Sequence, residues 1–253
     1  GVEALQRRAA RSLDEDHFRI QAILIDPGHG GRDPGAVASH VIDGKKVEIR
    51  EKDVVLEVAL DLHKRLSATY PDKRILLTRS GDTYPSLDER VQMANGIPLR
   101  NNEAIIYISI HCNASFNKSA RGYEVWYLSP EYRRDLVSNR VEAGNEDILP
   151  IINDMLEEEF TTESVIIARN MLHYFDSYFK GKTISRGLKA AEWFVVRNAK
   201  MPSVLVELGF VTNEQDARLL VDPAHLQLFA EALYSAVSDY IRNFESTAGV
   251  GTQ

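Results

Sequence analysis

Residues 23–35, ILIDPGHGGRDPG, decide the fold of this chain. An apolar run at the start of this stretch stops at an Asp-Pro-Gly turn, which is followed by His29 and two more glycines. Because proline fixes φ and glycine tolerates positive φ, such a turn can end a buried strand and hold an imidazole at the carboxyl edge of a sheet. On the turn alone, a metal ligand and an ordinary surface histidine explain His29 equally well.

Length and composition favour one large α/β domain. The chain has 253 residues, of which 44% are hydrophobic and 26% are charged, which is enough for a single large core. No apolar stretch approaches the roughly 20 residues that cross a bilayer, and residues 1–11 lack a signal-peptide pattern. We therefore expect a chain that is soluble as given. The missing signal-peptide pattern does not exclude export, because a mature exported protein would have lost its signal peptide.

Charge and cysteine content exclude several kinds of site. The net charge of −7 argues against a nucleic-acid partner. Ten acidic residues and three arginines lie within residues 131–163, so this segment accounts for the whole net charge. The single cysteine, Cys112, excludes an internal disulfide and a multi-cysteine zinc site, and we expect it to be a small buried side chain. A metal site would therefore use histidines and carboxylates.

Apolar periodicity predicts strands that alternate with helices. Besides the opening strand, strands are expected over residues 74–79, 104–110, 122–128, 193–196 and 204–207. Helices are expected over residues 54–70, 86–95, 148–160, 163–179 and 223–241, and residues 32–46 are expected to form a loop. This alternation predicts an α/β fold with a mostly parallel, twisted sheet of about six strands and helices on both faces.

The expected domain covers residues 21–244. Residues 1–20 are charged and mixed in sign, and we interpret them as a linker or a peripheral helix. The acidic segment, residues 131–163, is a helical insertion within the domain. Residues 245–253 form a flexible, glycine-containing tail.

Three polar residues follow or end predicted strands, namely His29, His111 and Glu207. The carboxyl ends of parallel strands meet at one edge of a sheet, where ligands bind. Two imidazoles and one carboxylate with an open fourth position form the ligand set of a catalytic zinc ion, and a second carboxylate can move protons. Glu51 is the other candidate carboxylate, although an acidic residue at a helix entrance more often interacts with the helix dipole. Spacing alone assigns neither role.

Five segments resemble the zinc-dependent N-acetylmuramoyl-L-alanine amidases, which cleave peptidoglycan. In chain order they are IDPGHGGRDPGA, REKDVVLEVALDL, LLTRSGDTYPSLDERVQMAN, YISIHCNAS and MPSVLVELGFVTN. The resemblance spans residues 23–241 and implies a zinc exopeptidase-like fold. It also implies one zinc ion bound by His29, Glu51 and His111, with Glu207 as the catalytic carboxylate.

The reaction implied by the resemblance is hydrolysis of the amide between the lactyl group of N-acetylmuramic acid and the L-alanine of the stem peptide. Such enzymes serve cell-wall remodelling or the separation of daughter cells. They act outside the cytoplasmic membrane, so the resemblance also implies export to the periplasm or cell envelope of a bacterium.

The acidic segment has no counterpart in the minimal family pattern. Some relatives that separate daughter cells carry a helical insertion near this point, which covers the active site until an activator protein displaces it. We hypothesise that residues 148–160 occlude the zinc here, with Glu157, Glu158 or Glu159 as the occluding carboxylate. The alternative is a solvated helix used for packing, because charge runs usually face water.

Two other functions fit the same residues. The first is a zinc exopeptidase on a related α/β scaffold that acts on a peptide substrate. The second is a non-catalytic wall-binding protein that has kept the fold. The presence of all four candidate residues argues against the second alternative.

Overall fold

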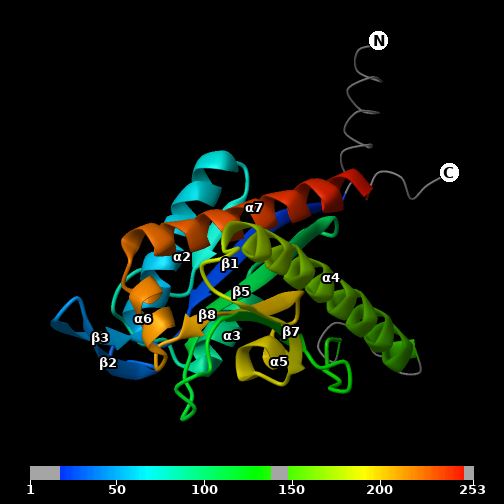
Figure 1. Cartoon of the computed structure of the whole chain (residues 1–253). Helices are drawn as coiled ribbons and strands as arrows, with labels where there is room; N and C mark the ends of the chain where they lie inside the picture. The colour runs from blue at the N-terminus through cyan, green and yellow to red at the C-terminus, as the bar shows by residue number, and fades with distance from the viewer. Residues whose placement is uncertain (1–17, 138–147, 248–253) are drawn as a thin grey trace.

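A six-stranded sheet forms the centre of the computed structural model, which describes residues 18–137 and 148–247. The strand order is β4-β1-β5-β8-β6-β7, and Figure 1 shows β1, β5 and β8 side by side within it. The strands are β1 (Arg19–Pro27), β4 (Arg74–Leu77), β5 (Glu103–Asn113), β6 (Tyr123–Leu128), β7 (Ser185–Ala191) and β8 (Ser203–Phe210). The first four in spatial order are parallel, and β6 and β7 run antiparallel to them. The predicted mostly parallel sheet of about six strands is confirmed.

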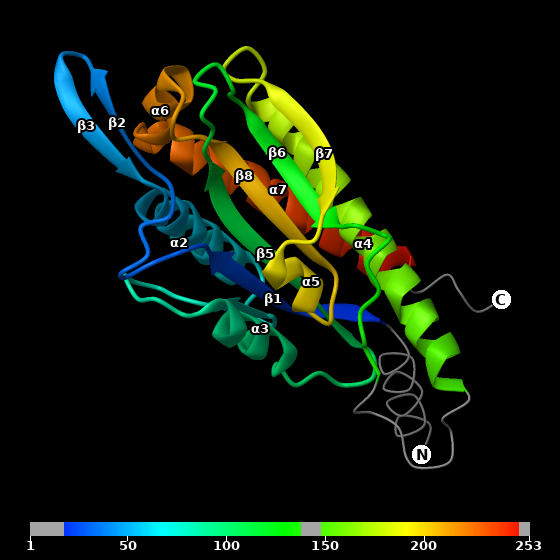
Figure 2. The ribbon, with the colours of Figure 1, turned by 90° about the horizontal axis from the view of Figure 1, so that it is seen from below.

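Helices cover both faces of this sheet, as predicted. One face packs against α2 (Glu51–Thr69), α4 (Leu149–Tyr178), α6 (Glu214–Leu220) and α7 (Pro223–Thr247). The other face packs against α3 (Leu87–Asn95) and α5 (Phe194–Asn198), which lie in front of the sheet in Figure 2. The buried side of α2 is the apolar stripe that the sequence predicts, with residues spaced three and four apart.

Helix α3 begins with a capping box. The side chain of Ser86 accepts a hydrogen bond from the backbone of Glu89, and the Glu89 carboxylate accepts one from the backbone of Ser86. This cap fixes the start of α3, which places the residues just before the helix beside the candidate site described below.

The structure differs from the prediction in three segments. The expected loop of residues 32–46 contains most of a hairpin, β2 (Val37–Ile42) and β3 (Lys45–Arg50). The two helices expected over residues 148–179 are one continuous helix, because neither glycine nor proline lies between them to interrupt it. The strand expected over residues 193–196 is helix α5, and the preceding residues form β7 instead.

The predicted ends of the domain lie mostly outside the described residues. Arg19 and Ile20 already belong to β1, and α7 ends at Thr247, so the ordered elements extend slightly past residues 21 and 244. The remainder of the predicted N-terminal segment and of the tail lies outside the residues that the structure describes. None of the described helices is long and apolar enough to cross a membrane.

We predict acid sensitivity from His225, which is buried in the first turn of α7. Its ring centroid lies 5.0 Å from that of Phe179 and 5.1 Å from that of Phe229. Burial, with the nearby charge of Lys182, lowers the pKa of His225 to about 4. Because the unfolded chain binds this proton near pH 6.5, the stability contributed by the neutral ring is complete above that pH and is lost as the pH falls towards 4.

The expected loss at His225 is up to about 3 kcal/mol of unfolding free energy between pH 7.5 and pH 4. Urea denaturation of the wild type and of His225→Gln at several pH values measures it, since the variant lacks the titrating ring. The variant should lose less stability on acidification. Equal losses in both proteins would contradict the prediction.

Candidate metal centre

His29, Glu51 and His111 meet at the carboxyl edge of the sheet. One ligand atom from each lies within 4.8 Å of those of the other two. Nε2 of His29 lies 3.2 Å from Oε1 of Glu51, and Nδ1 of His111 lies 3.0 Å from the same oxygen. Ligands of a tetrahedral zinc ion are about 3.4 Å apart, given metal–ligand bonds of about 2.1 Å. The donor types and their spacing therefore fit a zinc ion.

Glu51 is held rigidly as the first residue of α2. Its Oε1 accepts a hydrogen bond from the backbone N–H of Cys112 at 2.9 Å, and its Oε2 accepts one from Ala36 at 2.8 Å. Burial raises the pKa of Glu51, but the hydrogen bonds and charges of His111 and His29 outweigh it and hold the pKa well below its usual range. Glu51 is thus an ionised, buried carboxylate, which is costly without a positive partner.

His29 is oriented from behind by Asp33. Its Nδ1 lies 2.7 Å from Oδ2 of Asp33, so an Nδ1–H donor leaves Nε2 as the nitrogen that faces Glu51. The backbone of His29 has φ of 59°, in the left-handed region that non-glycine residues rarely adopt. The surrounding structure must therefore hold this residue in place.

Two glycines make room for the cluster. A Cβ atom on Gly28 would lie 2.3 Å from Cε1 of His111. A Cβ atom on Gly35, which has φ of 65°, would lie 2.5 Å from Oε2 of Glu51. Any side chain at either position would displace a candidate ligand, so the glycine content of the opening stretch follows from the packing of the site.

Glu207 lies beside the cluster on the next strand. It pairs in register with His111, is 7% exposed, and has an Oε2 atom that makes no hydrogen bond within the described part of the chain. Burial, with the negative charges of Glu51 and Glu124, raises the pKa of Glu207 well above its usual range. The structure thus places a carboxyl group that can hold a proton next to a group of three candidate metal ligands.

Comparison with known proteins decides the family. A family model described as N-acetylmuramoyl-L-alanine amidase matches residues 23–239. The chain belongs to this amidase family. Over 241 residues it is 30% identical to the N-acetylmuramoyl-L-alanine amidase AmiA of Escherichia coli K12, a match that covers 89% of this chain and 78% of AmiA. The resemblance inferred from the sequence is confirmed.

Solved structures of amidases share the fold. An N-acetylmuramoyl-L-alanine amidase from Clostridium difficile 630 is 26% identical and superposes with a TM-score of 0.63, over 88% of this chain and 98% of that one. The CwlD amidase of Clostridioides difficile, solved in complex with the GerS lipoprotein, is 22% identical with a TM-score of 0.64, over 88% and 99%. The second similarity is evidence for the fold alone.

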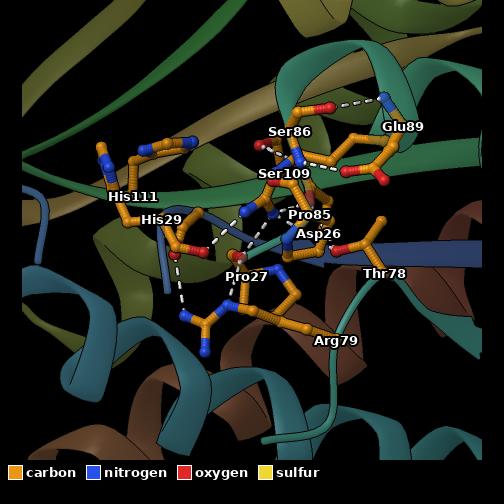
Figure 3. A network of polar contacts seen from close by, with 12 residues as sticks. Asp26, Pro27, His29, Thr78, Arg79, Pro85, Ser86, Glu89, Ser109 and His111 are labelled. Atoms are coloured by element: carbon orange, nitrogen blue, oxygen red, sulfur yellow. Dashed lines mark hydrogen bonds and ion pairs between the residues drawn. The ribbon is translucent and has the colours of Figure 1, made fainter. Parts of the chain in front are cut away.

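In this amidase, a fully buried carboxylate lies beneath the turn that carries His29. Asp26 accepts four hydrogen bonds of 2.5 to 2.8 Å, from Thr78, Arg90, Tyr107 and Ser109. Figure 3 shows Asp26 with Thr78 and Ser109 around it. Burial raises the pKa of Asp26, but the charge of Arg90 and the hydrogen bonds outweigh it and keep the pKa below its usual value. Asp26 is therefore an ionised carboxylate inside the sheet, held by its four hydrogen-bond donors.

Two buried arginines bind the turn that carries His29, and one of them, Arg90, also pairs with Asp26. Arg90 donates to the carbonyl oxygens of Pro27 at 2.8 Å and His29 at 2.6 Å. Arg79 donates to the carbonyl oxygens of Pro27 at 3.0 Å and Gly28 at 2.8 Å (Figure 3). Every backbone carbonyl from Pro27 to His29 thus accepts a bond from a guanidinium, which holds His29 in its strained conformation. Both arginines lie within residues 76–95, one of the segments that resemble the amidases, but no pattern in that segment predicts that they bind the turn.

A cavity of about 230 Å³ opens beside His29 and His111. Its lining is mostly apolar, and its apolar residues lie largely at and just before the starts of α3 and α5. Tyr84, Pro85 and Leu87 contribute from the start of α3, and Trp193, Phe194 and Val195 from the region of α5. An apolar cleft that ends on a cluster of polar side chains, here the three candidate metal ligands, is the usual form of a substrate site.

The structure does not bring the three glutamates 157–159 to the metal-ligand cluster. Glu157 is buried and forms an ion pair with Arg134, whose Nη1 also donates to the carbonyl oxygen of Ala199. Ala199 precedes β8, so Glu157 lies near the amino end of that strand. Glu207 lies towards the carboxyl end of the same strand. Glu158 and Glu159 are exposed. In this structure α4 packs against the domain and exposes its other face to solvent. This arrangement is the alternative to a helix that occludes the zinc site.

Proposed function

We propose that this chain hydrolyses the amide bond between the lactyl group of N-acetylmuramic acid and the L-alanine of the peptidoglycan stem peptide. His29, Glu51 and His111 hold one zinc ion in this proposal, and Glu207 is the catalytic carboxylate. The observation that carries the proposal is the convergence of three zinc-type donors beside a buried, unpaired carboxyl group. The family match over residues 23–239 supports the choice of substrate.

Each part of the site has a separate role in this reaction. When bound, a zinc ion supplies a Lewis acid for the amide carbonyl and lowers the pKa of a water molecule. Glu207 accepts the proton from the attacking water and donates it to the departing amide nitrogen. Asp33 keeps Nε2 of His29 directed at the cluster, and the apolar walls of the cavity hold the substrate against His29 and His111.

Mass spectrometry of digested sacculi tests this function. The expected products are intact stem peptides with a free N-terminal alanine, which disappear with a chelator and return with added zinc. A zinc exopeptidase would release single amino acids or shortened peptides instead. A non-catalytic wall-binding protein would bind the sacculi and release nothing, and metal analysis of the purified protein would separate that case from a poorly loaded enzyme.

The proposed substrate places the activity outside the cytoplasmic membrane. Peptidoglycan lies in the bacterial cell envelope, so the protein must reach the periplasm or the wall to act on it in remodelling or cell separation. Fractionation of bacteria that express the full-length gene tests the location. Recovery of the protein only with the cytoplasmic fraction would contradict it.

Control by a partner protein is a further part of this proposal. The CwlD amidase forms a complex with the GerS lipoprotein, which is a precedent for partner binding in this fold. In the present chain, Ile148, Ile151 and Met155 are exposed at three- and four-residue spacing along the start of α4. We propose that this apolar face binds an activator.

The position of Glu157 gives a prediction for the role of α4. Glu157→Gln should lower the free energy of unfolding by about 3 kcal/mol, because Arg134 is left buried without its ionised partner. Hydrolysis of sacculi at a temperature where the variant is folded should stay at the wild-type rate. Urea denaturation and release of dye from labelled sacculi measure the two effects.

Glu158→Gln is the matched control, because Glu158 is the exposed neighbour on the same helix. It should change neither stability nor hydrolysis. Faster hydrolysis by Glu157→Gln than by Glu158→Gln would show that α4 restrains the site in another conformation, contrary to the arrangement seen here.

A further inference from the structure

A row of charged side chains continues across the sheet beyond Glu207. His111 on β5 pairs in register with Glu207 on β8, and Glu207 pairs with Glu124 on β6. Register partners on neighbouring strands project from the same face, so these three side chains lie side by side. Arg186, on the outermost strand β7, donates from Nε to Oε2 of Glu124 at 2.7 Å. The row therefore leads from the metal-ligand cluster to a cation.

Two cations share the single carboxylate of Glu124. Lys189 donates to the same Oε2 as Arg186, while Glu124 itself is only 1% exposed. Burial raises the pKa of Glu124, but Lys189 and Arg186 outweigh it and keep the pKa below its usual value, so the carboxylate is ionised. The three groups together carry a charge of +1. One cation neutralises Glu124, and the positive charge of the second is in excess while the neighbouring Glu207 holds a proton.

Both cations remain accessible to a ligand. The side chain of Arg186 is 32% exposed and that of Lys189 is 30% exposed. Arg186 contacts Glu124 only through Nε and stacks its guanidinium over the ring of Phe210. Within the described residues its terminal Nη groups have no hydrogen-bond partner. A planar fork of this kind matches the geometry of a carboxylate.

Aromatic side chains connect these cations to the cavity beside the cluster. The cavity wall includes Trp193, whose ring lies edge-on to Trp126 with centroids 5.7 Å apart. Nζ of Lys189 lies 5.1 Å from the centre of the Trp126 ring. A chain that leaves the cavity past Trp193 therefore reaches Lys189 and then Arg186.

We propose that Arg186 and Lys189 form a subsite that binds a free carboxylate on the stem peptide, at the second or third residue beyond the scissile amide. The inference rests on the proposed function and specifies how the same site recognises its substrate. The anion belongs to the peptide side, because the lactyl carboxyl group of the sugar is consumed in the amide bond itself.

The spacing of the strands supports this assignment. Neighbouring strands are about 4.8 Å apart, so Glu124 is about 10 Å and β7 about 14 Å from His111. An extended peptide advances about 3.4 Å per residue. About three to four residues span these distances, and the Arg186 side chain reaches back towards Glu124, which favours the shorter end of that range.

Paired synthetic muropeptides test the subsite. Within each pair the members differ only in whether the second-residue or third-residue carboxylate is free or converted to the carboxamide. In one of the two pairs, the wild type should cleave the free acid with a kcat/KM about ten-fold or more above that for the amide. The difference should arise from a lower KM for the free acid. Arg186→Gln should reduce this ratio to near one by raising KM for the free acid, with kcat retained.

Arg19→Gln is the matched control, because Arg19 is also a partly exposed arginine paired with one glutamate, at the amino end of β1. It should keep the full preference. Thermal denaturation checks that both variants are folded. An absent preference in the wild type, or an equal loss on both substrates in Arg186→Gln, would overturn the proposal.

Binding without turnover separates this proposal from the proposed function. Calorimetric titration of Glu207→Gln with the same muropeptides compares the free acid with the amide when nothing is cleaved. A preference for the acid that Arg186→Gln abolishes in this background supports the subsite even if the wild type proves inactive. Wild-type inactivity on every substrate counts against the proposed function, whereas equal binding of acid and amide counts against the subsite.

Discussion

Glu207→Gln is expected to lower kcat for amide hydrolysis by about 10²–10⁴-fold while zinc binding is retained. Glutamine keeps the shape of the side chain but can neither accept the proton of the attacking water nor return one to the leaving nitrogen. Glu207 also lies outside the group of three candidate ligands, so its loss should leave the metal in place. Steady-state kinetics on a soluble muropeptide and zinc analysis of the purified variant measure both parts.

The matched control for this variant is Glu103→Gln. Glu103 has a nearly buried side chain paired with Arg19 at the amino end of the sheet, so it tests the general effect of removing such a carboxylate. It should retain wild-type kcat. Wild-type turnover by Glu207→Gln would exclude the proposed mechanism, and loss of zinc together with activity would make Glu207 a ligand instead.

The strand-end positions of the site could be predicted from sequence for a physical reason. Turn residues after a buried apolar run mark where a strand ends, and parallel strands bring such ends to one edge. His29, His111 and Glu207 can therefore be identified from the order of residues alone. Glu51 is different, because a carboxylate at a helix entrance more often interacts with the helix dipole than with a metal ion. Its proposed role came from the family resemblance.

The buried pair of Asp26 and Arg90, which holds the turn that carries His29, could not be predicted in the same way. Asp26 and Arg90 are 64 positions apart, and a periodic pattern contains no information about such a contact. An arginine on a short, polar helix is normally solvated, yet Arg90 is buried because its guanidinium reaches Asp26 at the end of β1 and the carbonyl oxygens of the turn that follows. The buried charge is tolerated only because Asp26 and the carbonyl oxygens of the turn compensate it.

Two of the local errors had different causes. The β2–β3 hairpin has a recognisable signal, since Asp43-Gly44 separates two runs of similar length and both residues adopt positive φ. Such an Asp-Gly pair is typical of a type I′ turn. By contrast, the four residues 193–196 are too few for periodicity to distinguish a strand from a buried helical turn. Only packing against the sheet decides the structure of that segment.

Arg90→Met is expected to lower the free energy of unfolding by about 3–5 kcal/mol, because Asp26 remains buried without its cation. It should also weaken zinc binding by about 10–100-fold, as the loss of a group that orients ligands usually does. Urea denaturation of the metal-free protein and competition with a zinc chelator measure the two effects. Arg65→Met is the control, since Arg65 forms a partly exposed pair with Asp61 on α2 and should cost at most about 1 kcal/mol.

A double variant separates stability from positioning. Asp26→Asn combined with Arg90→Met removes the unpaired buried charge, so much of the lost stability should return. Zinc affinity should not return with it, because the carbonyl oxygen of His29 still lacks the donor that holds its backbone in the left-handed conformation. If affinity recovered in parallel with stability, Arg90 would contribute only to the fold. If the two diverge, the guanidinium acts on the metal centre through the turn that carries His29.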